Sequence, residues 1–406
     1  MSTIKYSSNK TNKNIRMIVN LLIIYLYCIV AFVMSYLLTY ENLKVTSFYC
    51  SVMLVAVLFA SFAELTQRNI LLYNFFMFLS FFTLFFVYGF RNFSAIDDPS
   101  YIRIFEQISY VGWFEYFKFS TMEPGYLILN KIVSLFTDNY LYMQLITSFI
   151  PLFLFYYGFN KYKKIISLPT AVFLLCSILY FQMLSVALVR MFIAIGIVFV
   201  AISYIPERKP IKYMFLIAVA SMFHYSAFFM AILTYFAINK SNLTKKTIRF
   251  YTLVFLTSPL IFIFIGRFIV PLLGSRYKNY GSIDSINLSI ESFATLPLII
   301  LLLFFYKRFD ESEKAYFKIF IFIYSLSIII SMFGDMINLG RLVFYSYSAF
   351  ILGAAMVTKK IRLNSNKIVF LSIIILYGFL YLFYTQFLNV HHIPNLFPYK
   401  NIFFNL

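Results

Sequence analysis

Arg190, His224 and Arg341 stand in or beside long apolar stretches of this sequence, and a Glu-Pro-Gly-Tyr segment occupies residues 123–126. A charge at the centre of a membrane helix costs ~2.5–3.5 kcal/mol on insertion scales, so such a residue usually faces a cavity and has a partner. An arginine in that setting can bind an anion, and a histidine can move a proton near neutral pH. These positions are therefore the first candidates for chemistry.

Alanines recur at helical spacing on the faces of Arg190 and His224. Small residues allow helices to pack closely, which predicts that both side chains point into a helix bundle. Interpretations without a role in chemistry stay open for Arg190, His224 and Arg341. Arg190 could snorkel to the outer headgroups, His224 could be a core histidine bonded to a carbonyl, and Arg341 could close a loop by pairing with Asp335.

Asp97 and Asp98 follow the third apolar run and precede a proline. Paired carboxylates can bind a divalent metal or act as a base. Asp before Pro is equally a good helix start, so a capping role stays open. His391 and His392 lack further ligands at metal spacing, and we expect no metal. The sequence contains no Gly-rich phosphate loop, GxSxG elbow or HExxH motif.

The composition is that of a membrane protein. Of the 406 residues 62% are hydrophobic and 12% charged, whereas soluble domains have about 45–50% apolar and about 25% charged residues. The net charge of +19 does not indicate nucleic-acid binding, because the basic residues form short clusters between apolar runs, as positive-inside orientation requires. The three cysteines form no CxxC pair, so neither a disulfide framework nor a zinc site is suggested.

Apolar runs of sufficient length predict about 11 crossing helices in an all-α, polytopic transmembrane bundle. The predicted spans are residues 17–39, 46–63, 70–88, 140–158, 168–188, 190–205, 249–271, 291–306, 317–334, 341–358 and 368–388. With the polar, basic segment 2–16 in the cytoplasm, most of the 34 lysines and arginines fall on the inner side.

Residues 211–238 lie between two basic clusters that both favour the cytoplasm. At ~1.5 Å per residue this segment is too short to cross twice, so we expect a re-entrant or broken helical hairpin with residues 223–226 at its tip. A single long helix is the alternative, and it would reverse the membrane orientation of every later segment. Residues 1–406 are interpreted as one domain. Its long outer loop, 89–139, should carry amphipathic helices, one of them near 111–119, and a shorter outer loop is expected at about 272–290.

The order of these motifs resembles the EpsG family of Wzy-type polysaccharide polymerases. The resemblance covers roughly residues 85–400 and rests on short motifs in series. They are Gly89-Phe90-Arg91, Asp97-Asp98-Pro99-Ser100-Tyr101, Glu123-Pro124-Gly125-Tyr126, Arg190 with Ile-Ala-Ile-Gly after it, Phe223-His224-Tyr225-Ser226-Ala227, Arg341 and Pro398-Tyr399. The usual pattern has a Gly-Asp pair where Ile96-Asp97 stands here, so the role of Asp97 is open.

The resemblance implies that a growing chain on undecaprenyl diphosphate is transferred to a new lipid-linked repeat unit at the outer face of a bacterial inner membrane. Arginines suit a departing diphosphate, and the candidates are Arg190 and Arg341, with Arg91 and Arg276 as lesser ones. His224, Glu123 or Asp97 could act on the attacking hydroxyl. No cofactor is expected. Expected partners are the lipid-linked glycans, the bilayer, a flippase and a chain-length regulator, but no nucleic acid.

Two other functions stay open. A metal-dependent, polyprenyl-linked glycosyltransferase would use Asp97 and Asp98 as metal ligands or base. A flippase or transporter of lipid-linked sugars would need a polar cavity that reaches both faces and, usually, repeat symmetry. An O-acyltransferase is a weaker option. Loss of long chains with retention of single repeats after gene deletion would identify a polymerase.

Overall fold

The computed structural model describes residues 43–92, 97–112, 115, 122–181, 183, 188–233, 290–333, 340–361, 365–383 and 400–405. Helices make up most of this part of the chain, and the β-structure within it is one short hairpin. The all-α helical bundle predicted from the composition is confirmed.

The chain divides into two compact units, each built from separated segments. Unit 1 comprises residues 1–104, 139–189 and 354–406, and unit 2 comprises residues 105–138 and 190–353. Helices α4 (Asp98–Tyr110) and α16 (Val343–Lys360) run from one unit into the other. The single domain expected for residues 1–406 stays a prediction.

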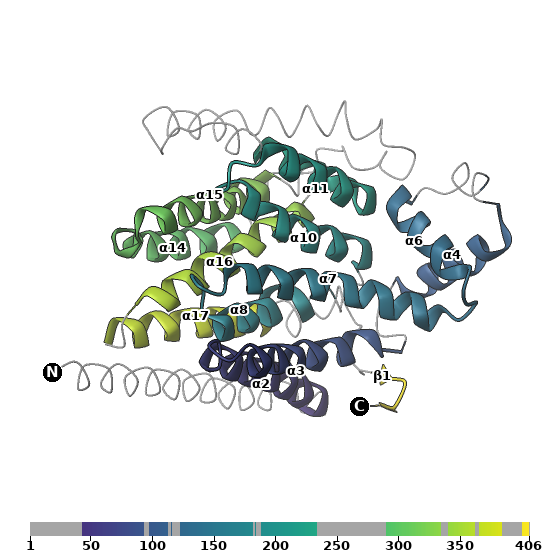
Figure 1. Ribbon diagram of the computed structural model, residues 1–406, viewed down its shortest axis with the longest axis horizontal. Coiled ribbons are helices and arrows are strands. Elements are labelled where there is room, and N and C mark those ends of the chain that lie inside the picture. Colours follow the sequence, from purple (N-terminus) through teal and green to yellow (C-terminus); the bar gives the residue numbers. More distant parts are fainter. Residues whose placement is uncertain are drawn as a thin grey trace. The chain divides into compact units, whose positions relative to one another are not determined.

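Unit 1 is a group of apolar helices. Its elements are α2 (Leu43–Leu65), α3 (Ile70–Gly89), α7 (Tyr140–Tyr162), α8 (Leu168–Leu174), the π-helix η2 (Leu175–Tyr180) and α17 (Ser365–Phe383). Helix α2 packs against α3 and α8, α3 against α7, and α17 against η2 (Figure 1). The side chains of Asn69 and Asn139 cap α3 and α7 by accepting backbone N–H groups of the first turn.

A short antiparallel hairpin completes unit 1. Strand β1 (Lys400–Asn401) pairs with β2 (Phe404–Asn405), so that Lys400 is opposite Asn405. The hairpin lies at the end of α3, because the backbone N–H of Ile402 donates to the carbonyl of Phe90 at 3.0 Å and Asn401 forms a bridge with Arg91. The ring of Phe403 stacks on Phe86. Residues 400–405 are therefore fixed at the carboxyl end of the third predicted span.

Unit 2 carries the remaining elements. They are α6 (Pro124–Ser134), α10 (Val189–Ala201), η3 (Ile202–Tyr204), α11 (Pro210–Phe223), η4 (Tyr225–Leu233), α14 (Ile290–Phe304), η8 (Tyr306–Arg308), α15 (Glu311–Phe333) and η10 (Gly340–Leu342). Helix α14 packs along α15, and α11 packs against both η4 and α6 (Figure 1). Helix α15 begins before the predicted 317, because Glu311 and Glu313 suit the positive end of a helix dipole.

Four described helices are long and apolar enough to cross a membrane. They cover Ser47–Leu65, Ile70–Gly89, Tyr140–Tyr162 and Gly340–Lys360, and shorter apolar helices cover Leu168–Tyr180, Val189–Tyr204, Pro210–Phe223 and Asn366–Leu382. The predicted spans at 17–39 and 249–271 lie outside the described residues, as does most of the predicted loop at 272–290 and of the segment 111–119. The number of crossings stays a prediction.

The broken hairpin predicted for 211–238 is present over its described part. Helix α11 ends at Phe223, and the 3-10 helix η4 starts at Tyr225 and packs back against it. The hydroxyl of Tyr213 donates to the carbonyl of Met230 at 2.6 Å, which joins the two arms. The break therefore falls at His224, within the predicted tip.

Candidate active site

The Glu-Pro-Gly segment at 123–125 starts helix α6. Glu123 occupies the N-cap position in an extended conformation. Pro124 follows at the first helical position, where its missing N–H costs nothing and its fixed φ suits a helix. The Glu123 side chain is fully buried. Local sequence thus places a carboxylate at a helix start inside unit 2.

Gly125 allows α6 to approach α11 closely. A Cβ atom at this position would lie 2.9 Å from the Cβ atom and 2.9 Å from the carbonyl oxygen of Met222. Real Cβ atoms essentially never come that close, and the backbone of Met222 cannot move aside cheaply. Glycine is therefore required for the approach, which brings Glu123 next to the end of α11.

Arg190 and His224 contact the two oxygens of that buried carboxylate. A guanidinium Nη1 of Arg190 donates to Oε2 of Glu123, and Nδ1 of His224 lies 3.0 Å from Oε1. Arg190 is itself buried at the start of α10. The interpretation of Arg190 as snorkelling to headgroups is thus wrong. The His224 side chain is 18% exposed, so it is the most accessible member of the group, which we call the Glu123 triad.

His224 is positioned by a break in the helical backbone. Its φ and ψ of −154° and 115° are extended, while the residues on either side are helical. Its N–H donates to the carbonyl of Ala220, and its carbonyl accepts the N–H of Ala227 at 2.9 Å. Both backbone groups are satisfied, so the chain can interrupt the helix here without an orphaned polar group.

A second polar contact lies just beyond the break. The hydroxyls of Ser226 and Tyr345 are 3.1 Å apart, and Tyr345 is fully buried in α16. Arg341 is exposed and stands one helical turn before Tyr345, in η10. Arg341 is therefore in the same unit as the Glu123 triad, on the 3-10 turn that leads directly into α16.

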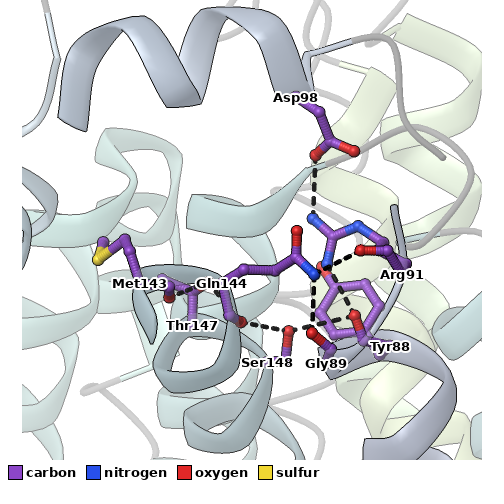
Figure 2. A network of polar contacts seen from close by, with 8 residues as sticks. All are labelled: Tyr88, Gly89, Arg91, Asp98, Met143, Gln144, Thr147 and Ser148. Carbon is purple, nitrogen blue, oxygen red and sulfur yellow. Dashed lines mark hydrogen bonds and ion pairs between the residues drawn. The ribbon is translucent and has the colours of Figure 1, made fainter. Parts of the chain in front are cut away.

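Arg91 belongs to a separate network in unit 1, shown in Figure 2. It is fully buried, and its guanidinium donates to Asp98 at 3.1 Å and to the carbonyl of Tyr88 at 2.9 Å. It also lies over the ring of Tyr88. The amide of Gln144, from α7, donates to the carbonyls of Gly89 and Arg91 at 2.7 Å each. The network ties the end of α3 to the starts of α4 and α7.

A family comparison decides the class of this protein. The family model named EpsG matches residues 74–401, which is most of the chain. The chain belongs to the EpsG family. This is a family of Wzy-type polysaccharide polymerases. No curated protein and no solved structure matches the chain.

Membership of the EpsG family, together with the apolar helices, shows a membrane protein with a polysaccharide-polymerase-like function. In broad terms it is a glycosyltransferase-type polymerase. All members of the Glu123 triad, and Arg91 and Arg341, lie inside the matched range.

The carboxylates at 97 and 98 differ in their settings. The carbonyl of Asp97 accepts the N–H groups of Ser100 and Tyr101 at 3.0 Å each, so Asp97 holds the cap position of α4 and is half-buried. Asp98 is buried and paired with Arg91. The interpretation of Asp97 as the residue that caps a helix therefore agrees with the backbone hydrogen bonds at the start of α4. A catalytic role for Asp97 stays a prediction.

The structure brings together three of the predicted site residues. Glu123, Arg190 and His224 meet in unit 2, whereas Arg91 is held in the network of unit 1. Arg276 and Asp335 lie outside the described residues. Sequence reasoning missed Tyr345, Ser226 and Gln144 as contacts, because hydroxyl and amide side chains in apolar helices have many possible partners. Ser226 belonged to the predicted tip at 223–226, and its hydroxyl there was the available signal.

Proposed function

We propose that this chain joins undecaprenyl-diphosphate-linked oligosaccharide repeat units into a surface polysaccharide on the outer face of the bacterial inner membrane. The supporting observation is the Glu123 triad, in which one buried carboxylate contacts both an arginine and a histidine. A basic and a titratable group in one place meet the two needs of transfer from a diphosphate, namely charge neutralisation and proton removal.

In the proposed reaction the acceptor hydroxyl oxygen attacks the anomeric carbon of the donor chain. A new glycosidic C–O bond forms while the C–O bond to the diphosphate breaks, and undecaprenyl diphosphate leaves with the bonding electron pair. His224 takes the hydroxyl proton. An ionised carboxylate can only accept hydrogen bonds, so His224 donates to Glu123 from Nδ1, and Nε2 is the nitrogen that receives the proton.

Glu123 is assigned to positioning in this scheme. Its side chain is fully buried, and its two oxygens are engaged by different side chains. It fixes the orientation of the imidazole and stabilises the imidazolium that forms on proton transfer, as a carboxylate behind a catalytic histidine does elsewhere.

The departing diphosphate is assigned to Arg190 and Arg341. An arginine presents several N–H donors in a planar fork that suits phosphate oxygens, and Arg190 is held against the same carboxylate as His224. Arg341 is exposed, so a ligand can reach it directly. Arg91 is a weaker candidate because it belongs to the Asp98 network of unit 1 and not to the Glu123 triad of unit 2.

The test is glycan size in cells that carry single variants. His224→Ala, Arg341→Ala and Arg190→Lys should each abolish long polymer while the lipid-linked single repeat accumulates. General acid–base groups contribute about 10²- to 10⁴-fold, enough to remove visible polymer. Immunoblots of membranes check insertion, and Arg308→Ala, on a short helix outside the triad, is the matched control that should keep wild-type chain lengths.

Long polymer in all three variants would refute the site assignment. Loss of every lipid-linked glycan, single repeats included, on deletion of the gene would instead indicate an earlier glycosyltransferase or a flippase. Under the proposal, a flippase supplies the repeat unit and a chain-length regulator is a further partner. Co-purification of either from membranes is the corresponding measurement.

A further inference from the structure

Tyr345 is a fully buried phenol in the apolar helix α16, and its hydroxyl lies 3.1 Å from Ser226. Burying a hydroxyl costs free energy unless it forms a hydrogen bond. Ser226 stands two residues after His224, in a 3-10 helix. The contact therefore joins α16 to the segment that follows the His224 break.

Helix η4, which follows the break, is expected to need contacts with other elements to hold it in place. Hydrogen bonds in 3-10 helices have poorer geometry than in α-helices, and long 3-10 runs are uncommon. The far part of η4 is held by Tyr213, which donates to the carbonyl of Met230. The Tyr345–Ser226 hydrogen bond is the corresponding tie at the near part, beside His224.

The same contact is made by the helix that directly follows the element carrying Arg341. Arg341 lies in η10, which continues directly into α16, and Tyr345 follows one turn later. A helical turn is rigid, so fixing Tyr345 against Ser226 fixes the backbone of Arg341 relative to His224. A base and a cation acting on the same transferred group must keep a set spacing, since small misplacements cost large factors in rate.

We propose that the Tyr345–Ser226 hydrogen bond is a positioning contact that sets the spacing between His224 and Arg341. The inference rests on the proposed function, because it assumes that His224 and Arg341 act on one substrate. Neither Tyr345 nor Ser226 needs to touch the substrate for this role.

The experiment compares Tyr345→Phe, Ser226→Ala and the double variant. Purified full-length protein is assayed with lipid-linked repeat units extracted from cells that lack the polymerase, and kcat, the apparent KM and the thermal unfolding midpoint are measured. Tyr347→Phe is the matched control, because Tyr347 is also buried and lies on the same helix.

Each single variant should lower kcat about tenfold and change the apparent KM less than about threefold, the size expected for one hydrogen bond expressed at the transition state. The double variant should fall no further than either single variant, because both remove the same contact. The unfolding midpoint should stay close to that of Tyr347→Phe, which should keep wild-type kcat.

Three results would overturn the inference. The first is a double variant whose kcat falls about a hundredfold, the product of the two single losses. The second is variants in which only the unfolding midpoint falls, and the third is an equal loss of kcat in Tyr347→Phe. The wild-type protein and His224→Ala separate this inference from the proposed function. If the wild-type protein makes no polymer from the lipid-linked repeat units, the proposed function fails. If His224→Ala keeps wild-type kcat, the role assigned to His224 fails, and with it the premise of this inference. If His224→Ala is inactive while Tyr345→Phe has wild-type kcat, only the positioning role fails.

Discussion

Glu123 has no contact with solvent, so its charge is sustained by the side chains at its two oxygens. Moving an unpaired carboxylate out of water is costly, and attraction to a cation offsets much of that cost. Arg190 supplies the cation and His224 supplies a hydrogen bond. The contacts that stabilise the Glu123 carboxylate also orient the imidazole of His224. The stability of the fold and the proposed catalysis therefore both depend on Glu123.

This dependence predicts how charge changes affect stability. Arg190→Met should destabilise the protein by about 3–5 kcal/mol, because it removes the cation from a buried ion pair and leaves the carboxylate in place. Adding Glu123→Gln should restore most of that stability, since the buried carboxylate is then gone as well, while polymer formation stays absent. Thermal unfolding in detergent measures the first effect and glycan size the second. A double variant as unstable as Arg190→Met would show that the ion pair is not the cause.

At the scale of elements, the triad depends on how closely two helix ends meet. Helix α6 starts with Glu123 and α11 ends just before His224, and Gly125 lies against the backbone of Met222 where they meet. Lys131 fixes the other end of α6 by donating to the carbonyls of Ile108 and Val111, at 2.9 Å each. Such bonds satisfy carbonyl groups at the carboxyl end of α4 that have no partner within the helix.

Gly125→Ala should therefore separate α6 from α11 and abolish polymer formation. In a helix without such a close contact, replacing glycine by alanine stabilises the helix by roughly 0.5–1 kcal/mol. A loss of polymer in Gly125→Ala would therefore come from the added Cβ atom and not from helix propensity. Gly353→Ala is the matched control: its added Cβ meets side-chain atoms no nearer than 3.8 Å, and wild-type chain lengths are expected. Normal polymer in Gly125→Ala would mean that the close approach is not needed for the triad.

The positions of the helices could be predicted from the sequence better than the contacts between them. Apolar runs predicted α2, α3, α7 and α16, and the two basic clusters around 211–238 predicted the break at His224, because length and charge sidedness act locally. The Arg190–Glu123 bond and the Tyr345–Ser226 bond join residues far apart in the chain. Which helices pack together decides these contacts, and apolar runs and charge clusters do not indicate which helices those are.

For the whole molecule, the described elements bear on how the chain is oriented in the membrane. The predicted orientation places the end of α3 outside, and the hairpin at 400–405 is bound to that end through Phe90. With the other spans as predicted, a return of the chain at His224, rather than a full crossing at 211–238, brings residues after α17 to the same side. The orientation stays a prediction, and the hydrogen bond between Ile402 and Phe90 is what it has to satisfy.

Cysteine labelling tests this orientation. In a variant with Cys28, Cys50 and Cys176 replaced by alanine, Glu106→Cys and Ile402→Cys should react with a membrane-impermeant maleimide on intact spheroplasts, because both positions are exposed and predicted to be outside. Lys209→Cys, also exposed but in a predicted cytoplasmic loop, should react only after permeabilisation. If Glu106→Cys reacts from outside and Ile402→Cys does not, residues 211–238 cross the membrane fully, and the hydrogen bond between Ile402 and Phe90 cannot form.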